Sequence, residues 1–280
     1  MPVVLALTSA LVYGVADYCG GRAARGHPSA IVAALGQAFS LILIVGVVLT
    51  IGTAIPPADD WAWGGLAGAA GALGLACFYA ALGGGSMSVV APTTAVVGVV
   101  IPVAAGLLQG ERPRLIGYFG IAVGVACVAL ISGLVGERHH HTPRRILVLA
   151  VLAGVGFGSL FVLLARTSQA SGLWPLVAAR VVSVPLLLAI VVSTSAKVGP
   201  DRRLLRFARV AGVLDNLANL TYLYAVRGGL LSLVAVISSL YPASTVALAY
   251  VVDGERVSAT QRLGMVLAAA ALVLVTLGRT

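Results

Sequence analysis

The chain has 280 residues, of which 60% are hydrophobic and 10% are charged, and its mean hydropathy is +1.05. Soluble domains carry about 25% charged residues, so this composition excludes a soluble protein. The net charge of +9 comes from basic residues spread over short segments between apolar runs, which indicates membrane topology rather than a nucleic-acid surface. We therefore expect an all-α, multi-pass protein of the cell membrane. Its expected partner is the lipid bilayer, and we expect no binding of nucleic acid.

Ten apolar runs are close to the roughly 20 residues that a helix needs to cross a bilayer. They cover residues 2–20, 30–52, 62–82, 87–109, 115–135, 145–166, 173–194, 207–226, 229–251 and 258–278. The first run has no basic segment before it and carries Asp17 and Tyr18 where a signal peptide would be cleaved, so we expect it to be retained. The connections are about 3 to 12 residues long, which leaves no room for a separate soluble domain.

The two halves of the chain match each other at an offset of 144 residues, which places Ala81–Leu134 on Ala225–Gly278. The most specific match is the Gly-Glu-Arg triplet at 110–112 and 254–256. Upstream, residues 37–40 match residues 180–183 at an offset of 143. Because repeats determine architecture, we predict five-helix repeats at 1–136 and 145–280, joined by a linker loop at 137–144.

A unit of five spans ends on the opposite side of the membrane from where it began, so the second unit must enter upside down. Such inverted repeats surround a site near the bilayer midplane and alternate between two open states. The segments after the odd-numbered spans carry twelve Lys and Arg residues, and the other side carries five. By the positive-inside rule this count places both termini outside the cytoplasm.

Two polar stripes lie in the first half. Tyr13 and Asp17 are four residues apart on one face of the run 2–20. Asp17 is either an interfacial carboxylate near Arg22 or part of the transport pathway, where it is a candidate for proton coupling. Gln37 and Ser40 form a second stripe in the run 30–52.

Three prolines are expected to act as hinges or gates, because proline removes a backbone donor and bends a spanning helix. They are Pro92 and Pro102 in the run 87–109 and Pro242 in the run 229–251. Glu111 and Glu255 lie in the two Gly-Glu-Arg turns, which we expect to sit at the membrane interface.

The strongest polar signal lies in the second half. Arg180 is about 10 Å into the run 173–194, at 1.5 Å per residue, and shares a face with Ser183. In the run 207–226, one face carries Asp215, Asn219 and Tyr222, with Asn216 beside them. A carboxylate near the centre of a span costs several kcal/mol, so Asp215 either pairs with Arg180 as a structural bridge or titrates and contacts substrate.

No set of residues predicts metal or catalytic chemistry. Cys19, Cys77 and Cys127 occur singly in apolar runs, and His139, His140 and His141 are consecutive in the segment between the halves, which is not a metal-ligand spacing. We therefore expect no metal, no cofactor and no enzymatic activity.

These features resemble the EamA-type carriers of the drug/metabolite transporter superfamily. The resemblance rests on ten spans in two units, on the Gly-Glu-Arg turns and on Tyr241-Pro242 standing 13 residues ahead of Glu255. Arg180 is similar to an arginine in the second helix of a family unit, where the first unit has Gln37, and Gly98 replaces the matching proline. The resemblance implies export or exchange of small metabolites or drugs without ATP, with termini in the cytoplasm.

We therefore expect a secondary transporter whose central cavity binds a small molecule through Gln37, Arg180, Asp215, Asn216, Asn219, Tyr222 and Tyr241. The alternatives are an ion or small-solute channel or facilitator, and a structural membrane subunit without transport. Glycine faces in the runs 62–82 and 115–135 could serve either internal packing or a homodimer. The run 258–278 is expected to be a peripheral helix that packs on its own half.

Overall fold

The structure is a computed structural model that describes residues 1–24, 27–52, 54–84, 87–131, 143–195, 201–254 and 257–278. All regular structure in these ranges is helical. The α-helices are α1 (Pro2–Ala24), α2 (Ser29–Ile51), α3 (Ala58–Gly84), α4 (Met87–Leu108), α5 (Leu115–Ile131), α6 (Arg144–Ala165), α7 (Trp174–Ser193), α8 (Arg202–Arg227), α9 (Leu231–Ser238), α10 (Tyr241–Asp253) and α11 (Ala259–Leu277), and a short 3-10 helix covers Gln169–Ser171.

The helices are those of a multi-pass membrane protein. Among the described residues, seven segments are long and apolar enough to cross a bilayer, and Thr93–Leu108 and Leu115–Ile131 are shorter apolar helices. One of the seven, Leu231–Asp253, comprises α9 and α10 together. Helix α8 is not one of the seven: several arginines occupy its first turns, and Asp215, Asn216 and Asn219 follow in its second half. The all-α membrane class is confirmed, whereas the count of ten spans stays a prediction.

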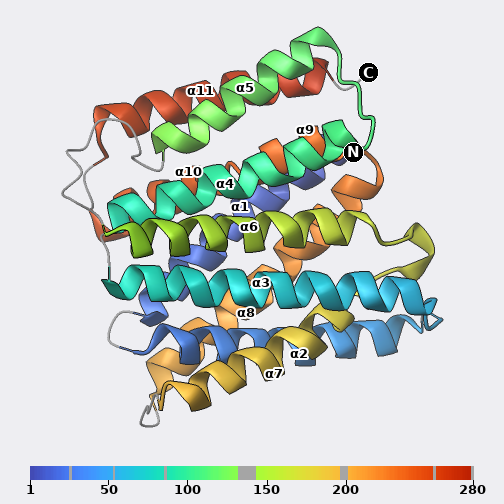
Figure 1. Ribbon diagram of the computed structural model, residues 1–280, viewed down its shortest axis with the longest axis vertical. Coiled ribbons are helices and arrows are strands. Elements are labelled where there is room, and N and C mark those ends of the chain that lie inside the picture. Colours follow the sequence, from blue (N-terminus) through green and yellow to red (C-terminus); the bar gives the residue numbers. More distant parts are fainter. Residues whose placement is uncertain are drawn as a thin grey trace.

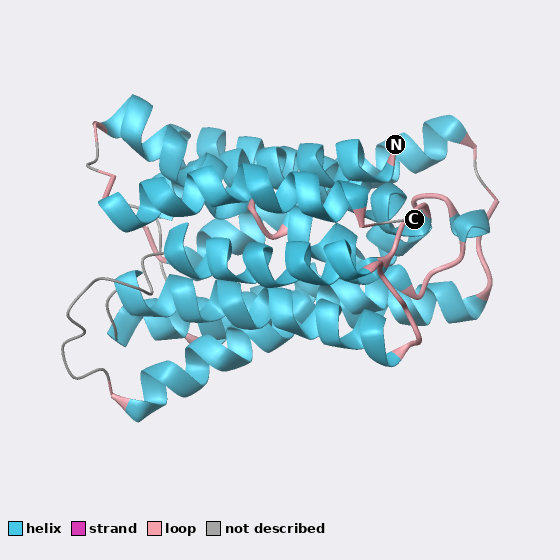
Figure 2. Cartoon of the chain, turned by 90° about the horizontal axis from the view of Figure 1, so that it is seen from above, coloured by secondary structure: helices cyan, strands magenta, loops and turns pink. Residues whose placement is uncertain are grey.

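The helices lie side by side in one bundle, with both termini at the same end (Figures 1 and 2). Helix α1 begins at that end, and α6 begins at the opposite one (Figure 1). Helices α5 and α11 pack against each other at one edge of the bundle, and α2 and α7 lie at the other. The prediction that 258–278 packs on its own half is incomplete: α11 contacts α9 of its own half, but its main partner is α5, the corresponding helix of the other half.

The main helix contacts correspond to one another when the two halves are exchanged. The pair α1–α8 corresponds to α6–α3, α2–α8 to α7–α3, and α1–α10 to α6–α4, while α2–α7, α4–α9 and α5–α11 correspond to themselves. Single hydrogen bonds obey the same exchange. Thr94 Oγ1 donates to Ala150 O (3.0 Å), and Ser238 Oγ, 144 residues later, donates to Ala6 O (3.5 Å). The offset seen in the sequence is thus also a relation in space.

Glycine allows the closest of these crossings. A Cβ on Gly212 of α8 would clash with the backbone of Gly36 on α2, and a Cβ on Gly68 of α3 would clash with the backbone of Ala179 on α7. The two crossings are equivalent under exchange of the halves. The glycine faces of α3 and α5 are also used inside the chain, because Gly74 packs on α6 and Gly120 packs on α11.

The span made of α9 and α10 is broken between two helices that differ in packing. All eight residues of α9 are buried, whereas no residue of α10 is buried. Pro242 lies in the first turn of α10, where its missing N–H leaves no helical bond unmade. In contrast, α4 runs without interruption through Pro92, whose side chain lies outside the described residues, and Pro102. Of the three predicted hinge prolines, Pro242 alone coincides with a helix break.

Candidate functional site in the membrane interior

Arg180 of α7 is the centre of a polar network in the middle of the bundle. Its Nη1 donates to Gln37 Oε1 of α2 at 2.6 Å, and its Nη2 forms an ion pair with Asp215 Oδ2 of α8. The Arg180 side chain is 4% exposed and that of Asp215 is 27% exposed. The structure therefore shows the Arg180–Asp215 pair that the sequence offered as one alternative, and adds Gln37 to it.

Gln37 connects the two charged residues. Its Oε1 also accepts from Ser183 Oγ at 3.0 Å, and its Nε2 lies 3.5 Å from Asp215 Oδ2. Gln37 and Arg180 occupy equivalent positions in the two halves, and they contact each other directly. The two halves are therefore related across the α2–α7 interface. The halves thus meet through chemically different residues, and the positive charge comes from one of them.

The side chains of the two predicted asparagines donate hydrogen bonds to backbone carbonyl groups near this network. Asn216 Nδ2 donates to Ser40 O across the α2–α8 contact, and Asn219 Nδ2 donates to Asp215 O at 2.8 Å within α8. Ser40 Oγ, Asn216 Oδ1 and Arg180 Nε are buried and have no hydrogen-bond partner among the described residues. Because buried polar atoms are normally satisfied, these three atoms mark the part of the interior with hydrogen-bonding capacity to spare.

Aromatic rings lie between α1, α6, α8 and α10. Tyr222 stacks on Phe161 with centroids 4.3 Å apart, and its hydroxyl donates to Phe161 O at 3.1 Å. Tyr13 contacts Phe161 at 6.0 Å and Tyr241 at 6.3 Å between ring centroids. Tyr222 is fully buried, whereas Tyr13 and Tyr241 are partly exposed. Of the predicted tyrosines, Tyr241 therefore has surface to offer a ligand and Tyr222 does not.

Asp17 of α1 is exposed, although it lies well inside the helix. It makes no hydrogen bond or ion pair among the described residues and interacts electrostatically with Asp215. The interpretation of Asp17 as a partner of Arg22 is not supported, because Arg22 Nη1 bonds Asp253 Oδ1 and the Tyr18 hydroxyl, each at 2.8 Å. This bond ties the ends of α1 and α10 together.

Glu111 has a role that the sequence did not reveal. Its two carboxylate oxygens accept from the backbone N–H groups of Leu231 and Ser232, the latter at 2.9 Å. A carboxylate at this place satisfies the free donors of the α9 N-terminus and opposes the positive end of the helix dipole. The only available signal was the match between turn 110–112 and turn 254–256; Glu255 itself lies outside the described residues.

The end of the bundle that carries the termini is joined by a second polar cluster. Arg227 Nη1 donates to Gly172 O at 2.8 Å, and its Nη2 donates to Ser171 Oγ at 2.9 Å. Nearby, Asp60 accepts from the N–H of Ser168 at 2.8 Å and from its hydroxyl at 2.6 Å. These bonds connect α3, α8 and the segment before α7.

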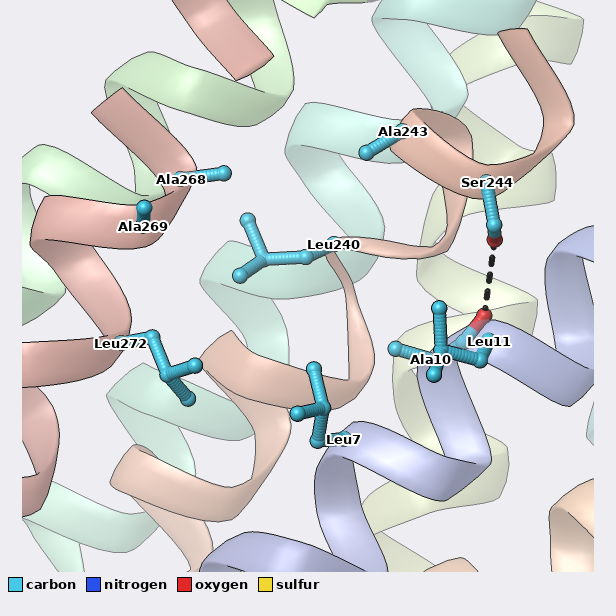
Figure 3. Close-up of a pocket in the computed structure, with 9 residues that line it drawn as sticks. All are labelled: Leu7, Ala10, Leu11, Leu240, Ala243, Ser244, Ala268, Ala269 and Leu272. Carbon is cyan, nitrogen blue, oxygen red and sulfur yellow. Dashed lines mark hydrogen bonds between the residues drawn. The ribbon is translucent and has the colours of Figure 1, made fainter. Parts of the chain in front are cut away.

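A cavity of about 190 Å³ lies apart from the charged network (Figure 3). Its lining is apolar except for Ser244, whose hydroxyl donates to Ala10 O at 3.2 Å. It is bounded by α1, the residues at the α9–α10 break and α11, and contains Leu7, Ala10, Leu11, Leu240, Ala243, Ser244, Ala268, Ala269 and Leu272. None of the predicted polar site residues lines it, so we place the candidate site at the charges rather than at this cavity.

Within the described ranges, no group of three or more His, Cys, Asp or Glu residues is arranged to hold a metal ion. His139, His140, His141 and the predicted linker up to residue 142 lie outside the described residues. The three cysteines are free thiols inside the helices.

The sequence model of the EamA-like transporter family matches residues 1–133 and 144–277. The chain belongs to this family. The two matched segments cover both halves of the EamA-like chain, and the resemblance stated from the Gly-Glu-Arg turns is confirmed. The family indicates a membrane transporter of the drug/metabolite type.

A solved structure supports the fold of this EamA-like chain. Described only as a crystal structure of a protein, it aligns with a TM-score of 0.84 and 17% sequence identity, over 99% of this chain and 96% of its own. At this identity the likeness establishes the fold and nothing about substrate. A search of curated proteins finds no match.

Proposed function

We propose that the chain is a secondary-active transporter that exports or exchanges a small metabolite or drug by alternating access, with proton coupling. The observation that carries the proposal is an ion pair between the buried Arg180 and the partly exposed Asp215, inside apolar helices and at the contact between the two halves of the molecule. Charges inside spanning helices normally belong to substrate or ion pathways. The exchange of helix contacts between the halves supports ten spans arranged as two inverted five-helix repeats.

The broken span supplies the movable part in this proposal. Helix α9 is buried on all sides and held at its N-terminus by Glu111, whereas α10 is loosely packed and held at its far end by Arg22. Breaking the Arg22–Asp253 bond would let α10 pivot about Leu240 while α9 stays in place. Such a motion opens the interior at the end of the bundle opposite the termini.

Asp215 and Asp17 are the two carboxylates that could carry a coupled proton. Asp215 already forms an ion pair with Arg180, so its charge is balanced by a neighbouring side chain. Asp17 has no such partner among the described residues. We therefore propose Asp17 as the proton carrier and Asp215 as the counter-ion that keeps Arg180 in the bundle, with Gln37 fixing the geometry of both.

Proton release on addition of solute tests this proposal. Purified protein in weakly buffered detergent is titrated with a metabolite and drug panel while a pH indicator is read, for wild type, Asp17→Asn, Asp215→Asn and the control Asp59→Asn. We expect wild type and the control to release protons with at least one solute, and Asp17→Asn to release none at solute concentrations that saturate it. Release that persists in Asp17→Asn but stops in Asp215→Asn would move the carrier to α8.

Counterflow in proteoliposomes tests the transport class itself. Vesicles loaded with unlabelled solute should accumulate the labelled form transiently if the protein alternates between two open states. A channel gives no such overshoot, and a structural subunit gives no flux at all.

A further inference from the structure

The exposed surface of Asp17 faces the interior of the bundle rather than the lipid. At about 100° per residue, Asp17 lies within about 20° of Ala6 and Ala10 around the helix, and both are buried, at 0% and 3% exposure. It lies about 120–140° away from Leu11 and Val4, the residues of α1 that are 52% and 62% exposed. Ala16 and Cys19, the buried residues closest to Asp17 in sequence, lie about 100–160° away around the helix. The electrostatic interactions of Asp17 with Asp215 of α8 and Tyr241 of α10 place its carboxylate toward these two helices.

The exposed surface around Asp17 continues toward the end of α1. One turn after Asp17, Gly21 is exposed, and no atom lies within 4 Å of the place where its Cβ would be. Asp17 itself is about 6 Å from the middle of α1, at 1.5 Å per residue. The carboxylate is therefore reached from one end of the bundle and stands just beyond its centre.

The negative charge of Asp17 is not compensated. Arg180 is committed to Asp215 and Gln37, and Arg22 is committed to Asp253 and Tyr18. Asp17 interacts electrostatically with Asp215, so among the described residues its nearest charged neighbour of the interior is another carboxylate and the surroundings of Asp17 are negatively charged. Such a site attracts cations and repels anions.

Aromatic rings complete the site on the side of the bundle centre. Tyr13 precedes Asp17 by one turn on the same face, and Tyr241 of α10 lies 6.3 Å from Tyr13 between ring centroids. Asp17 interacts electrostatically with Tyr241. Both rings are partly exposed, and ring faces beside a carboxylate favour an organic cation, because the ring quadrupole adds to the charge attraction.

We propose that the substrate is an organic cation, a protonated amine or quaternary ammonium with a small apolar body, whose charge binds Asp17 while its body rests on Tyr13 and Tyr241. This inference rests on the proposed transport function and names its substrate class. The site is single, because the position equivalent to Asp17 in the second half is Phe161. It adjoins the hinge at Pro242, so a bound cation contacts both α1 and the movable α10.

Two isosteric probes of different charge, together with an aromatic anion, test the proposal. Benzyltrimethylammonium is the cation, neopentylbenzene its neutral analogue and benzoate an anion, and binding to detergent-purified protein is measured by calorimetry. Wild type should bind the cation at least about tenfold more tightly than the neutral analogue, and Asp17→Asn should lose most of that preference. Tyr13→Leu and Tyr241→Leu should each weaken cation binding about fivefold.

Matched variants separate binding from folding. Asp59→Asn removes an exposed carboxylate from the first turn of α3 and Tyr118→Leu an exposed tyrosine from α5, and both should bind like wild type. Asp17→Glu keeps the charge and should retain the preference for the cation. Monodispersity and thermal unfolding of each variant show that loss of binding is not loss of fold.

Three outcomes overturn the cation assignment: equal affinity for the cation and its neutral analogue, cation binding unaffected by Asp17→Asn, or a preference for benzoate. If counterflow of another solute is then observed, the transport function stands and the substrate class alone is wrong. If neither cation binding nor counterflow of any panel solute is found, both proposals fail.

Discussion

Arg180 and Asp215 each lower the cost of carrying a charge within the membrane interior. Their ion pair is stabilised by Gln37, and the side chain of Arg180 has almost no contact with solvent. A buried pair of this kind is weak evidence for net stabilisation, whereas removal of one partner is strongly destabilising. The stability and transport activity of variants of this pair therefore distinguish a structural role from a functional one.

A double-mutant cycle makes that separation. Arg180→Met leaves the Asp215 carboxylate unpaired and should lower the free energy of unfolding by about 3 kcal/mol, whereas Arg180→Met/Asp215→Leu should recover most of the loss. Chemical unfolding in detergent, followed by far-UV circular dichroism, measures both. Counterflow that returns in the double variant would assign the pair a purely structural role; a stable but inactive double variant supports the functional one.

The sequence predicted the charged residues of the site and named the Arg180–Asp215 pair as one alternative, but it did not predict that Gln37 contacts Arg180. Arg180, Asp215 and Gln37 could be found because a polar residue in an apolar span is costly and therefore informative. The exposure of Asp17 could not be found, because it depends on where α8 and α10 stand relative to α1. For the same reason the sequence did not separate Tyr222, which is buried against Phe161, from Tyr241, which is partly exposed.

At the scale of the helix, the broken span depends on a contact made far away in the chain. Glu111 lies 120 residues before Leu231 and holds the N-terminus of α9. The Gly-Glu-Arg turn was correctly placed between two helices, but local spacing contains no information about a carboxylate that caps a helix of the other half. The break before Pro242 was predicted from proline chemistry, while the uninterrupted course of α4 through Pro102 shows that proline alone does not cause a break.

Replacing Glu111 by Ala should loosen the start of α9. The backbone N–H groups of Leu231 and Ser232 lose their acceptor, which should cost about 1 kcal/mol, as loss of a helix cap does. Hydrogen exchange of residues 229–238, measured by mass spectrometry, should become faster, and Glu111→Gln should lie between Ala and wild type because it keeps an acceptor without the charge. Unchanged exchange in this segment would show that the carboxylate does not hold α9.

Arg22→Gln should release the end of α10 from α1. Cys19 is 9% exposed and lies one turn before Arg22 on α1, so its labelling by N-ethylmaleimide reports the opening. We expect Cys19 to react several-fold faster in the variant, while Cys127, which is 0% exposed on α5, stays unreactive. Equal acceleration at both cysteines would indicate general unfolding instead of a local opening.

For the whole molecule, the equivalence of the halves predicts that substitutions at two equivalent glycines lower the stability by similar amounts. Gly68→Ala and Gly212→Ala each place a methyl group against the backbone of a neighbouring helix, at crossings that correspond under exchange of the halves. Each should destabilise the protein by about 1–3 kcal/mol, and the two losses should be similar. Thermal unfolding in detergent measures them, with Gly46→Ala as the control because nothing lies within 4 Å of its added Cβ.

Unequal losses, with one variant as stable as wild type, would contradict the spatial equivalence of the halves.

The offset of 144 residues predicted which positions correspond, because both halves share one pattern of small and large residues. It did not predict that most helix contacts join one half to the other, as α1 joins α8 and α3 joins α6. The residue pattern of a helix in one half does not indicate which helix of the other half it contacts.

The bond between Arg22 and Asp253 has no counterpart in the other half. The equivalent positions are Arg166 and Gln109, whose side chains make no hydrogen bond or ion pair among the described residues. Two open states related by exchange of the halves would have equal free energies only if both ends were closed by equal bonds. Under the proposed alternating access, this single bond favours one of the two states at rest, and half-saturating solute concentrations should differ between the two faces of the membrane even without any gradient.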